Sequence, residues 1–563
     1  MSYDLVPVKA PRAAGNLLKM LAPVLENPIT GAALAGKILA DAGIQYLRDI
    51  PCDAAHTTAP PLPMLPAPNA LTPTDTAPPS LDLPRQAIPG FSFETAADFT
   101  DAYAAGRVSP IEVAERVLAW TGATESQEPK MRIFISQRRD DVMRQAEASA
   151  RRWRNGESLG PLDGVPVAVK DELDQTPYPT TVGTAFLGRS PASSDATPVA
   201  RMRAAGALLI GKTNMHEMGL GVTGVNPHHG ACRNPYDPAR APGGSSSGVA
   251  AAVAAGLCPI AIGADGGGSI RIPASLCGVV GLKATWGRVS EHGAAPLCWS
   301  VAHVGPIAAT VRDTALAYAM MAGPDPLDPN SLRQPPLTLD DFDRTDLTGI
   351  KIGVFRPWFE DAEAEVVARC REALGHLEAA GATIVDVIIP ELRAMQSAHL
   401  VTIASEMAAA HARYFAEHRK SYGLDTRMNL ALARRLTAAD YVHAQRHRTR
   451  LCQHFTDVLR HVDVIATPST GCTAPLIPAD SLVTGESNLP LTATIMRFAQ
   501  PGNLTGLPGI SVPAGYDDAG MPVGLQLMGR PWAEHTLLNL GRVVEAAVSR
   551  QSPVVYRGLL SET

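Results

Sequence analysis

The chain has 563 residues, a formal net charge of −6 at pH 7 and a pI near 6.2. This charge excludes a general nucleic-acid-binding protein, which would be basic. With 45% hydrophobic and 18% charged residues, the composition indicates a globular protein with a substantial core. The length predicts two to four domains, although a large α/β enzyme can also form one.

The cysteines and the apolar segments indicate where the protein resides. Its eight cysteines are scattered without a CxxC pair, which predicts reduced thiols in an intracellular protein rather than disulfides or a zinc site. No signal peptide is visible, and no apolar span reaches the ~18 residues of a transmembrane helix. The most apolar span, 249–264, is broken by Pro259 and predicts a buried helix followed by a buried strand. We therefore expect a cytoplasmic or peripherally membrane-associated protein.

Residues 11–47 are predicted to be helical, within an N-terminal element that covers residues 1–50. Asn27-Pro28 divides this segment into two short helices, because the residue before a proline disfavours helix. Apolar side chains recur on one face of the first helix: Leu17, Leu18, Leu21, Val24 and Leu25. Two interpretations remain, since the helices either pack on the body of the protein or form an apolar cap or membrane-surface element.

The body of the protein is predicted to begin near Phe91, after a linker or strap over residues 51–90 that contains eleven prolines. Ser109 and Pro110 are expected to start a helix, as the N-cap and the first helical residue. Beyond them, short β-like segments alternate with amphipathic segments, which predicts α/β layers around a largely buried sheet. The predicted buried strands are 165–170, 207–212, 259–264, 350–355, 382–389 and 462–467.

The first of two serine-bearing loops is APGGSSSGVAAAVAAG (241–256). Residues 244–248 match the nucleophile-elbow motif G-x-S-x-G, with Ser246 in the nucleophile's position. That motif must follow a strand, whereas residues 233–242 hold three prolines and no β pattern. A nucleophile elbow is therefore disfavoured.

The second loop, GADGGGSIRIPASLCG (263–278), has three consecutive glycines before Ser269. Gly266, Gly267 and Gly268 allow successive backbone N–H groups to converge beside the Ser269 hydroxyl, as in an oxyanion site. From these residues alone, an oxyanion site and a tight turn with a capping serine remain equal alternatives.

A nucleophilic serine needs a base, and no histidine stands in a diagnostic context. Lys170 ends the apolar segment GVPVAVK, where burial would favour the neutral amine that accepts a proton. From this segment alone, a surface charge at the end of a strand is the favoured interpretation.

Three segments together resemble the amidase signature family: GVPVAVKD (164–171), PGGSSSGVAAAVAAG (242–256) and GADGGGSIRIPASLCGVVGLK (263–283). The resemblance implies an amidase signature catalytic domain over residues 91–563, with an α/β fold in which helices cover both faces of a large mixed sheet. By position it implies a Ser–Ser–Lys triad, with Lys170 as general base and Ser269 as nucleophile. Ser245 would be the bridging serine, with a cis peptide at this residue.

Residues around the expected triad are predicted to support it. The N–H groups of Gly266, Gly267, Gly268 and Ser269 would hold the oxyanion. Asp265 and Arg271 are expected to form a supporting ion pair, and Ser246 with Ser247 to support its loop and cap the next helix.

Within the family, the chain resembles plant-type fatty acid amide hydrolases in KAPRAAGNLLKML, GGSSSG, ADGGGSIRIP and the C-terminal block from VDVIATPSTGCTAPLIP onward. Position 266 is Gly here, where most amidases carry Thr. The resemblance implies a serine amidohydrolase of N-acylethanolamine-type amides that works through an acyl-enzyme and needs no metal or cofactor. It also implies a homodimer, with residues 11–47 capping the substrate entrance and contacting a membrane peripherally.

Other functions remain as alternatives. One is an amidase of aryl or short-chain amides or carbamates. Another is the glutamine-hydrolysing subunit of a tRNA-dependent amidotransferase, and a third is a non-catalytic lipid-binding homologue. The presence of Lys170, Ser245 and Ser269 argues against the last.

Overall fold

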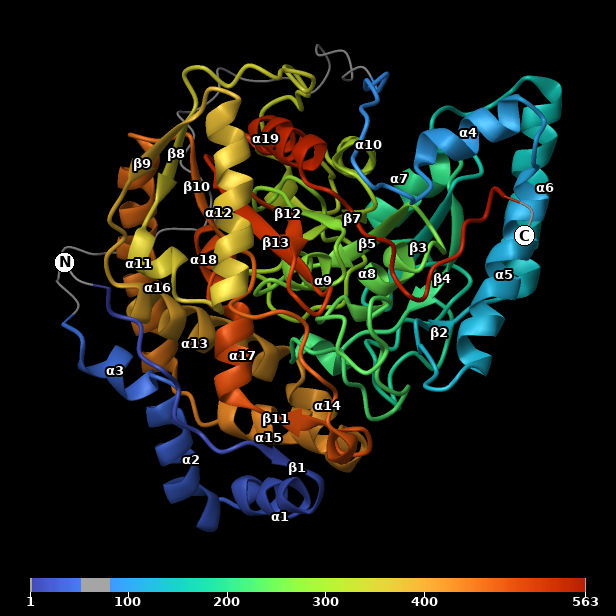
Figure 1. The fold of residues 1–563 in the computed structure, drawn as a ribbon. Helices are drawn as coiled ribbons and strands as arrows, with labels where there is room; N and C mark the ends of the chain where they lie inside the picture. The colour runs from blue at the N-terminus through green and yellow to red at the C-terminus, as the bar shows by residue number, and fades with distance from the viewer. Residues whose placement is uncertain (1–2, 52–80, 562–563) are drawn as a thin grey trace.

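The computed structural model describes residues 3–51 and 81–561 (Figure 1). The linker predicted over residues 51–90 falls largely on residues 52–80, which lie outside the described residues. The division of the chain into domains stays a prediction.

A mixed sheet of eleven strands forms the centre of the molecule (Figure 1). In chain order its strands are β2 (Phe134–Ser136), β3 (Pro166–Lys170), β4 (Leu208–Thr213), β5 (Ile260–Ala264), β6 (Val280–Lys283), β7 (Val304–Ala308), β8 (Lys351–Val354), β9 (Thr383–Asp386), β10 (Val464–Pro468), β12 (Gly509–Tyr516) and β13 (Pro522–Gly529). Their order across the sheet is β2-β4-β3-β5-β7-β6-β12-β13-β10-β8-β9. The predicted α/β class is confirmed.

The apolar segments predicted as strands form the sheet, with one correction. β3, β4, β5 and β10 are buried along their whole length, as expected for strands covered on both faces. The prediction that 382–389 is a buried strand was wrong, because β9 spans only Thr383–Asp386 and its two end residues are exposed. β9 is the outermost strand and has a neighbour, β8, on one side only.

Helices cover both faces of the sheet. In chain order the helices of the body are α4 (Ala96–Ala104), α5 (Pro110–Ser126), α6 (Arg139–Asn155), α7 (Thr197–Ala204), α8 (Ser247–Ala254), α9 (Arg271–Leu276), α10 (Val311–Met321), α11 (Arg356–Phe359), α12 (Ala364–Ala379), α13 (Leu392–Ala410), α14 (Ala412–His418), α15 (Leu424–Ala433), α16 (Ala438–Leu459), α17 (Leu489–Met496), α18 (Gln500–Thr505) and α19 (Glu534–Ala547). α19 packs on α10 and α12, and all three contact the sheet, while α8 and α9 contact each other and the sheet.

Local sequence signals set several helix boundaries. α5 begins as predicted, with Ser109 and Glu112 forming a reciprocal capping box and Pro110 at the first helical position. The span 249–264 is confirmed as a buried helix followed by a strand, because most of it forms α8 and β5.

The N-terminal segment forms three helices, α1 (Gly15–Glu26), α2 (Thr30–Asp41) and α3 (Ile44–Asp49). The predicted break at Asn27-Pro28 is confirmed, and α3 is additional. α1 packs on α15, with Leu18 and Leu25 buried, while Leu17 and Met20 are exposed. The apolar face predicted for α1 is therefore only partly covered.

Hydrogen bonds and ion pairs fasten this segment to the C-terminal part of the chain. The short strand β1 (Ala13–Ala14) pairs antiparallel with β11 (Glu486–Ser487). Arg12 Nε lies 2.6 Å from a Glu486 carboxylate oxygen. In Figure 1 α1 lies below α15 and β11 and α3 lies near α13, and all three helices are far from α5 and α6.

Asp313 in the first turn of α10 and Glu545 of α19, which accepts the Val311 N–H, are two buried carboxyl groups beside the start of α10. They predict that the stability of the protein depends on pH. Burial raises the pKa of Asp313 and of Glu545 to about 7 each. The native state therefore holds these protons more tightly than the unfolded chain, so their contribution is complete below about pH 4 and is lost as the pH rises through 7. Each group changes the free energy of unfolding by on the order of 3 kcal/mol over this interval.

We expect Glu545→Gln to reduce the fall in melting temperature between pH 5 and pH 7.5 by a few degrees. The amide retains an oxygen to accept the Val311 N–H, which Glu545 accepts at 2.9 Å. Thermal unfolding across this pH range provides the measurement, with Glu378→Gln on the exposed side of α12 as control. Equal pH slopes for Glu545→Gln and the wild type would contradict the expectation.

Candidate active site

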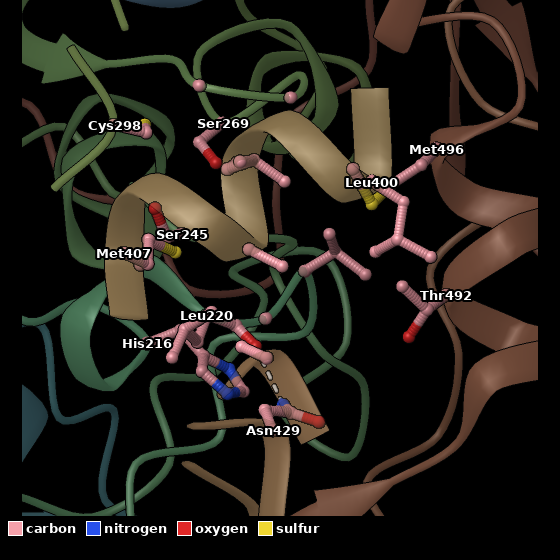
Figure 2. A pocket seen from close by; sticks show the side chains of 18 of the residues that line it. His216, Leu220, Ser245, Ser269, Cys298, Leu400, Met407, Asn429, Thr492 and Met496 are labelled. Carbon is pink, nitrogen blue, oxygen red and sulfur yellow. Dashed lines mark hydrogen bonds between the residues drawn. The ribbon is translucent and has the colours of Figure 1, made fainter. Parts of the chain in front are cut away.

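A cavity of about 210 Å³ is lined both by residues at the edge of the sheet and by residues of the N-terminal helices. Lys170, Ser245 and Ser269 lie in its wall, as do Ile38 and Leu39 of α2. Much of the remaining wall is apolar and comes from α13, α15 and α17, including Leu400, Ile403, Met407, Leu430, Leu432, Leu491 and Met496. Figure 2 shows Ser245, Ser269 and Cys298 along one side and Asn429 and Thr492 along the other.

Lys170 lies at the carboxyl end of β3 and is buried, with 1% of its surface exposed. Its Nζ donates to Ser245 Oγ at 2.9 Å and to the carbonyl oxygen of Ala264, the last residue of β5, at 3.2 Å. Because β3 and β5 run parallel, their carboxyl ends meet at one edge of the sheet. This pairing places Lys170 beside the Ala264 carbonyl, and the loop before α8 brings the Ser245 hydroxyl, 75 residues from Lys170 in the sequence, into hydrogen-bond contact with it.

The loop before α8 places Ser245 in the pocket wall, whereas the neighbouring Ser246 and Ser247 lie outside the wall. The Gly244–Ser245 peptide is cis, as the resemblance implies. Ser246 lies outside the pocket wall and donates to the Ala264 carbonyl at 3.1 Å, and Ser247 donates to the Asn214 carbonyl at 3.3 Å. The predicted capping of α8 was wrong, because the side chain of its N-cap residue Ser246 makes no capping bond.

The glycine loop after β5 carries Ser269 into the pocket. Gly266, Gly267 and Ser269 line the cavity, and their amide groups have no protein acceptor in the described part of the chain. The Gly268 N–H instead donates to Asp265 Oδ1 at 2.6 Å. Three of the four predicted oxyanion donors are thus unengaged.

Steric crowding explains why position 266 is occupied by glycine. A Cβ there would lie 2.7 Å from Cys298 Sγ, closer than van der Waals contact. Cys298 lines the pocket, but burial, aided by the nearby Glu406 and Glu172 carboxylates, raises its pKa well above the ordinary value. It is therefore a protonated thiol.

The ion pair expected between Asp265 and Arg271 is present beneath the loop, at 3.0 Å and fully buried. Although burial raises the Asp265 pKa, the charge and hydrogen bonds of Arg271 hold it well below its ordinary value. Arg271 also donates to the Asn503 side chain at 2.6 Å and to Gln526 at 2.7 Å. This network connects the loop to α18 and β13.

Sequence reasoning missed two polar residues next to the site. Glu172 Oε2 lies 2.7 Å from Lys170 Nζ, and both side chains are buried. Its position two residues after Lys170, just past the end of a strand, was the available signal. His399 of α13 contacts the glycine loop through Gly266. The sequence separation of 133 residues left no signal for that contact.

Two further features bear on cofactors and membranes. Among residues 3–51 and 81–561, no three His, Cys, Asp or Glu side chains are grouped so that they could hold a metal ion. Within the same residues, none of the helices combines the length and apolar character needed to cross a bilayer.

Comparison with known proteins places the chain in a family. The family model described as Amidase matches residues 115–538. A fatty acid amide hydrolase of Oryza sativa subsp. japonica is 43% identical over 493 residues, which covers 86% of this chain and 81% of the relative. One of Arabidopsis thaliana is 36% identical over 584 residues, covering 99% and 96%.

The family also includes other activities. A glutamyl-tRNA(Gln) amidotransferase subunit of Chloroflexus aggregans is 36% identical over 469 residues, which covers 78% of this chain and 93% of the relative. The solved structure of the peptide amidase of Stenotrophomonas maltophilia superposes with a TM-score of 0.71 at 30% identity, covering 82% of this chain and 98% of that one. The chain therefore belongs to the amidase signature family and is an enzyme that hydrolyses amide bonds.

Proposed function

We propose that this enzyme hydrolyses N-acyl amides with a long apolar acyl chain, such as N-acylethanolamines, to the free acid and the amine. The observation that carries the proposal is the pocket wall around Ser269, to which four separate helices contribute Leu, Ile and Met side chains. An apolar wall favours an apolar chain because the chain leaves water on binding. The plant relatives named as fatty acid amide hydrolases support the same substrate class.

In the proposed mechanism, Ser269 Oγ attacks the amide carbonyl carbon and its proton passes through Ser245 to the neutral amine of Lys170. The 2.9 Å contact between Lys170 and Ser245 supports the second transfer. The structure records no hydrogen bond from Ser269 Oγ to Ser245, and such contacts often tighten only when substrate is bound. The ammonium formed at Lys170 would lie 2.7 Å from the Glu172 carboxylate, which stabilises it.

The same groups serve the rest of the cycle. The free amide groups of Gly266, Gly267 and Ser269 would stabilise the oxyanion. Ser245 then returns the proton to the leaving nitrogen as the C–N bond breaks, because an amine leaves poorly without one. Water attacks the acyl-enzyme at Ser269, gives up its proton along the same route and releases the acid.

The N-terminal helices are proposed to close the acyl end of the pocket. This role is supported by Ile38 and Leu39, which share the pocket wall with Ser269. The exposed apolar side chains Leu17 and Met20 support the proposal of peripheral membrane contact. Homodimerisation stays a proposal that rests on the resemblance alone.

We expect kcat/KM to increase with acyl length across N-acylethanolamines from two to eighteen carbons, by at least about 10²-fold in total. Each buried methylene contributes about 0.8 kcal/mol, so about four of them suffice for that ratio. Product release measured over this series, with a benzoyl amide included, provides the test. Preference for the benzoyl or acetyl substrate would refute the long-chain assignment and favour an aryl or short-chain amidase.

A matched pair of variants tests the contribution of the N-terminal helices. Leu39→Asn places a polar group in the pocket wall, whereas Ile29→Asn changes an apolar side chain that is 86% exposed outside it. We expect Leu39→Asn to weaken selection for long chains and to leave acetyl substrates unaffected. An equal effect of both variants would show that this segment does not contact the acyl chain.

A further inference from the structure

His399 lies directly beneath the glycine loop and is fully buried in α13. Its Nε2 is 2.9 Å from the carbonyl oxygen of Gly266. Its ring also packs on the next residue, since a Cβ at Gly267 would lie 3.0 Å from His399 Cε1. One side chain therefore contacts both residues of the Gly266–Gly267 peptide unit.

The protonation of His399 follows from these surroundings. Burial lowers its pKa to about 4, although the hydrogen bond to Gly266 opposes this, and the charged groups nearby are Arg448, Asp265 and Arg271. The ring is therefore neutral at the pH of most assays. Because Nε2 faces a carbonyl oxygen, Nε2 carries the proton and donates it. Nδ1 has no hydrogen-bond partner among the described residues.

The direction of this hydrogen bond determines where the next N–H points. In a planar trans peptide, the C=O and N–H groups of the same peptide unit point in opposite directions. A Gly266 carbonyl directed at His399 therefore turns the Gly267 N–H away from His399. Gly267 lines the pocket and His399 does not, so the side away from His399 is the side of the substrate.

We propose that His399 is a positioning residue that fixes the Gly266–Gly267 peptide so that the Gly267 N–H faces the oxyanion. A glycine pair has unusual backbone freedom, and without an anchor this peptide would rotate at little cost. The hydrogen bond to the carbonyl also polarises the peptide and strengthens its N–H as a donor. The inference rests on the proposed role of Ser269 as nucleophile.

Three substitutions separate the hydrogen bond from the packing. His399→Phe keeps a ring against Gly267 and removes the donor, while His399→Gln places an amide N–H close to the position of Nε2. His399→Asn is the matched control, because its amide reaches only the position of the unpartnered Nδ1. We expect His399→Phe and His399→Asn to lower kcat about tenfold to a hundredfold, less than the ~10²–10³-fold cost of removing an oxyanion donor outright.

The decisive readouts are the split between kcat and KM and the binding of a tetrahedral adduct. KM for the best amide of the acyl series should change less than about twofold, because the ground-state substrate carries no oxyanion. The inhibition constant of a trifluoromethyl ketone with the same acyl chain should rise in proportion to the loss in kcat/KM. His399→Gln should recover most of both losses.

Several outcomes would overturn the inference. Wild-type kcat in His399→Phe would do so, as would a rise in KM at unchanged kcat. Equal losses in His399→Gln and His399→Asn would assign a purely structural role to this residue, and this comparison decides the question even if His399→Phe fails to fold. Activity retained in Ser269→Ala would refute the proposed mechanism itself, whereas an inactive Ser269→Ala beside a fully active His399→Phe refutes the inference about His399 alone.

Discussion

Ser269→Ala is expected to lower kcat for the best amide substrate by at least about 10⁴-fold, the order of loss seen when a nucleophile is removed from a serine hydrolase. Without Oγ no acyl-enzyme can form, and water must attack the amide directly. The Ala side chain fills less of the pocket wall, so substrate binding should persist. Steady-state kinetics and binding of the same amide by calorimetry check both expectations.

Two neighbouring serines provide controls for this substitution. Ser275 is buried in α9, the helix that follows the glycine loop, and lies outside the pocket wall. Ser246 lies in the other serine loop, with its hydroxyl on the Ala264 carbonyl. Ser275→Ala should retain near wild-type kcat, and Ser246→Ala should retain far more activity than Ser269→Ala, because neither hydroxyl is the proposed nucleophile. A Ser269→Ala enzyme that keeps more than about 1% of wild-type activity would refute the assignment of the nucleophile.

Much of the fold followed from local sequence patterns. The buried strands are short runs of β-branched and small apolar residues, and their burial on both faces leaves little alternative to a central sheet. The capping box at Ser109 and Glu112 needs only side chains and backbone within four consecutive residues, so a short local pattern marks the start of this helix. β9 was misjudged because its sequence resembles a central strand, whereas its position at the sheet edge depends on chain topology.

The candidate site was predictable only where function imposes a motif. Lys170, Ser245 and Ser269 lie in segments whose residue patterns resemble a family, and the structure brings all three to one pocket. The contacts of Glu172 and His399 arise from tertiary packing, which leaves no local pattern. The acyl wall is harder still to predict, because its residues come from segments as far apart in the sequence as Ile38 and Met496.

The occupied Gly268 amide shows a related limit of sequence reasoning. Three consecutive glycines suggest that each of their amide groups can donate to an oxyanion. The backbone conformation at Gly268 instead directs its N–H to Asp265. Gly268 has φ +118°, a region that side chains disfavour, and its N–H turns to Asp265. Asp265 in turn is fixed by Arg271. Asp265 therefore occupies one donor of the loop, and the amides of Gly266, Gly267 and Ser269 are left without a protein acceptor among the described residues.

Lys170→Met is expected to lower kcat by about 10⁴-fold or more, because no other base contacts Ser245 among the described side chains. The thioether keeps most of the volume of the lysine stem and cannot accept the proton. The substitution has a second consequence, since it leaves the buried Glu172 carboxylate without its partner at 2.7 Å. A buried carboxylate that loses a hydrogen-bond donor costs about 1–3 kcal/mol, so melting temperature should fall as well.

The double variant Lys170→Met/Glu172→Gln separates the two effects. Replacing the carboxylate by a neutral amide should restore most of the melting temperature, because the buried carboxylate that lost its donor is then absent. Activity should stay at the level of Lys170→Met, since the proton acceptor is still missing. Recovery of kcat together with stability would show that Lys170 acts only by balancing Glu172. A stable double variant without activity would instead identify Lys170 as the base that the Ser245 hydroxyl requires.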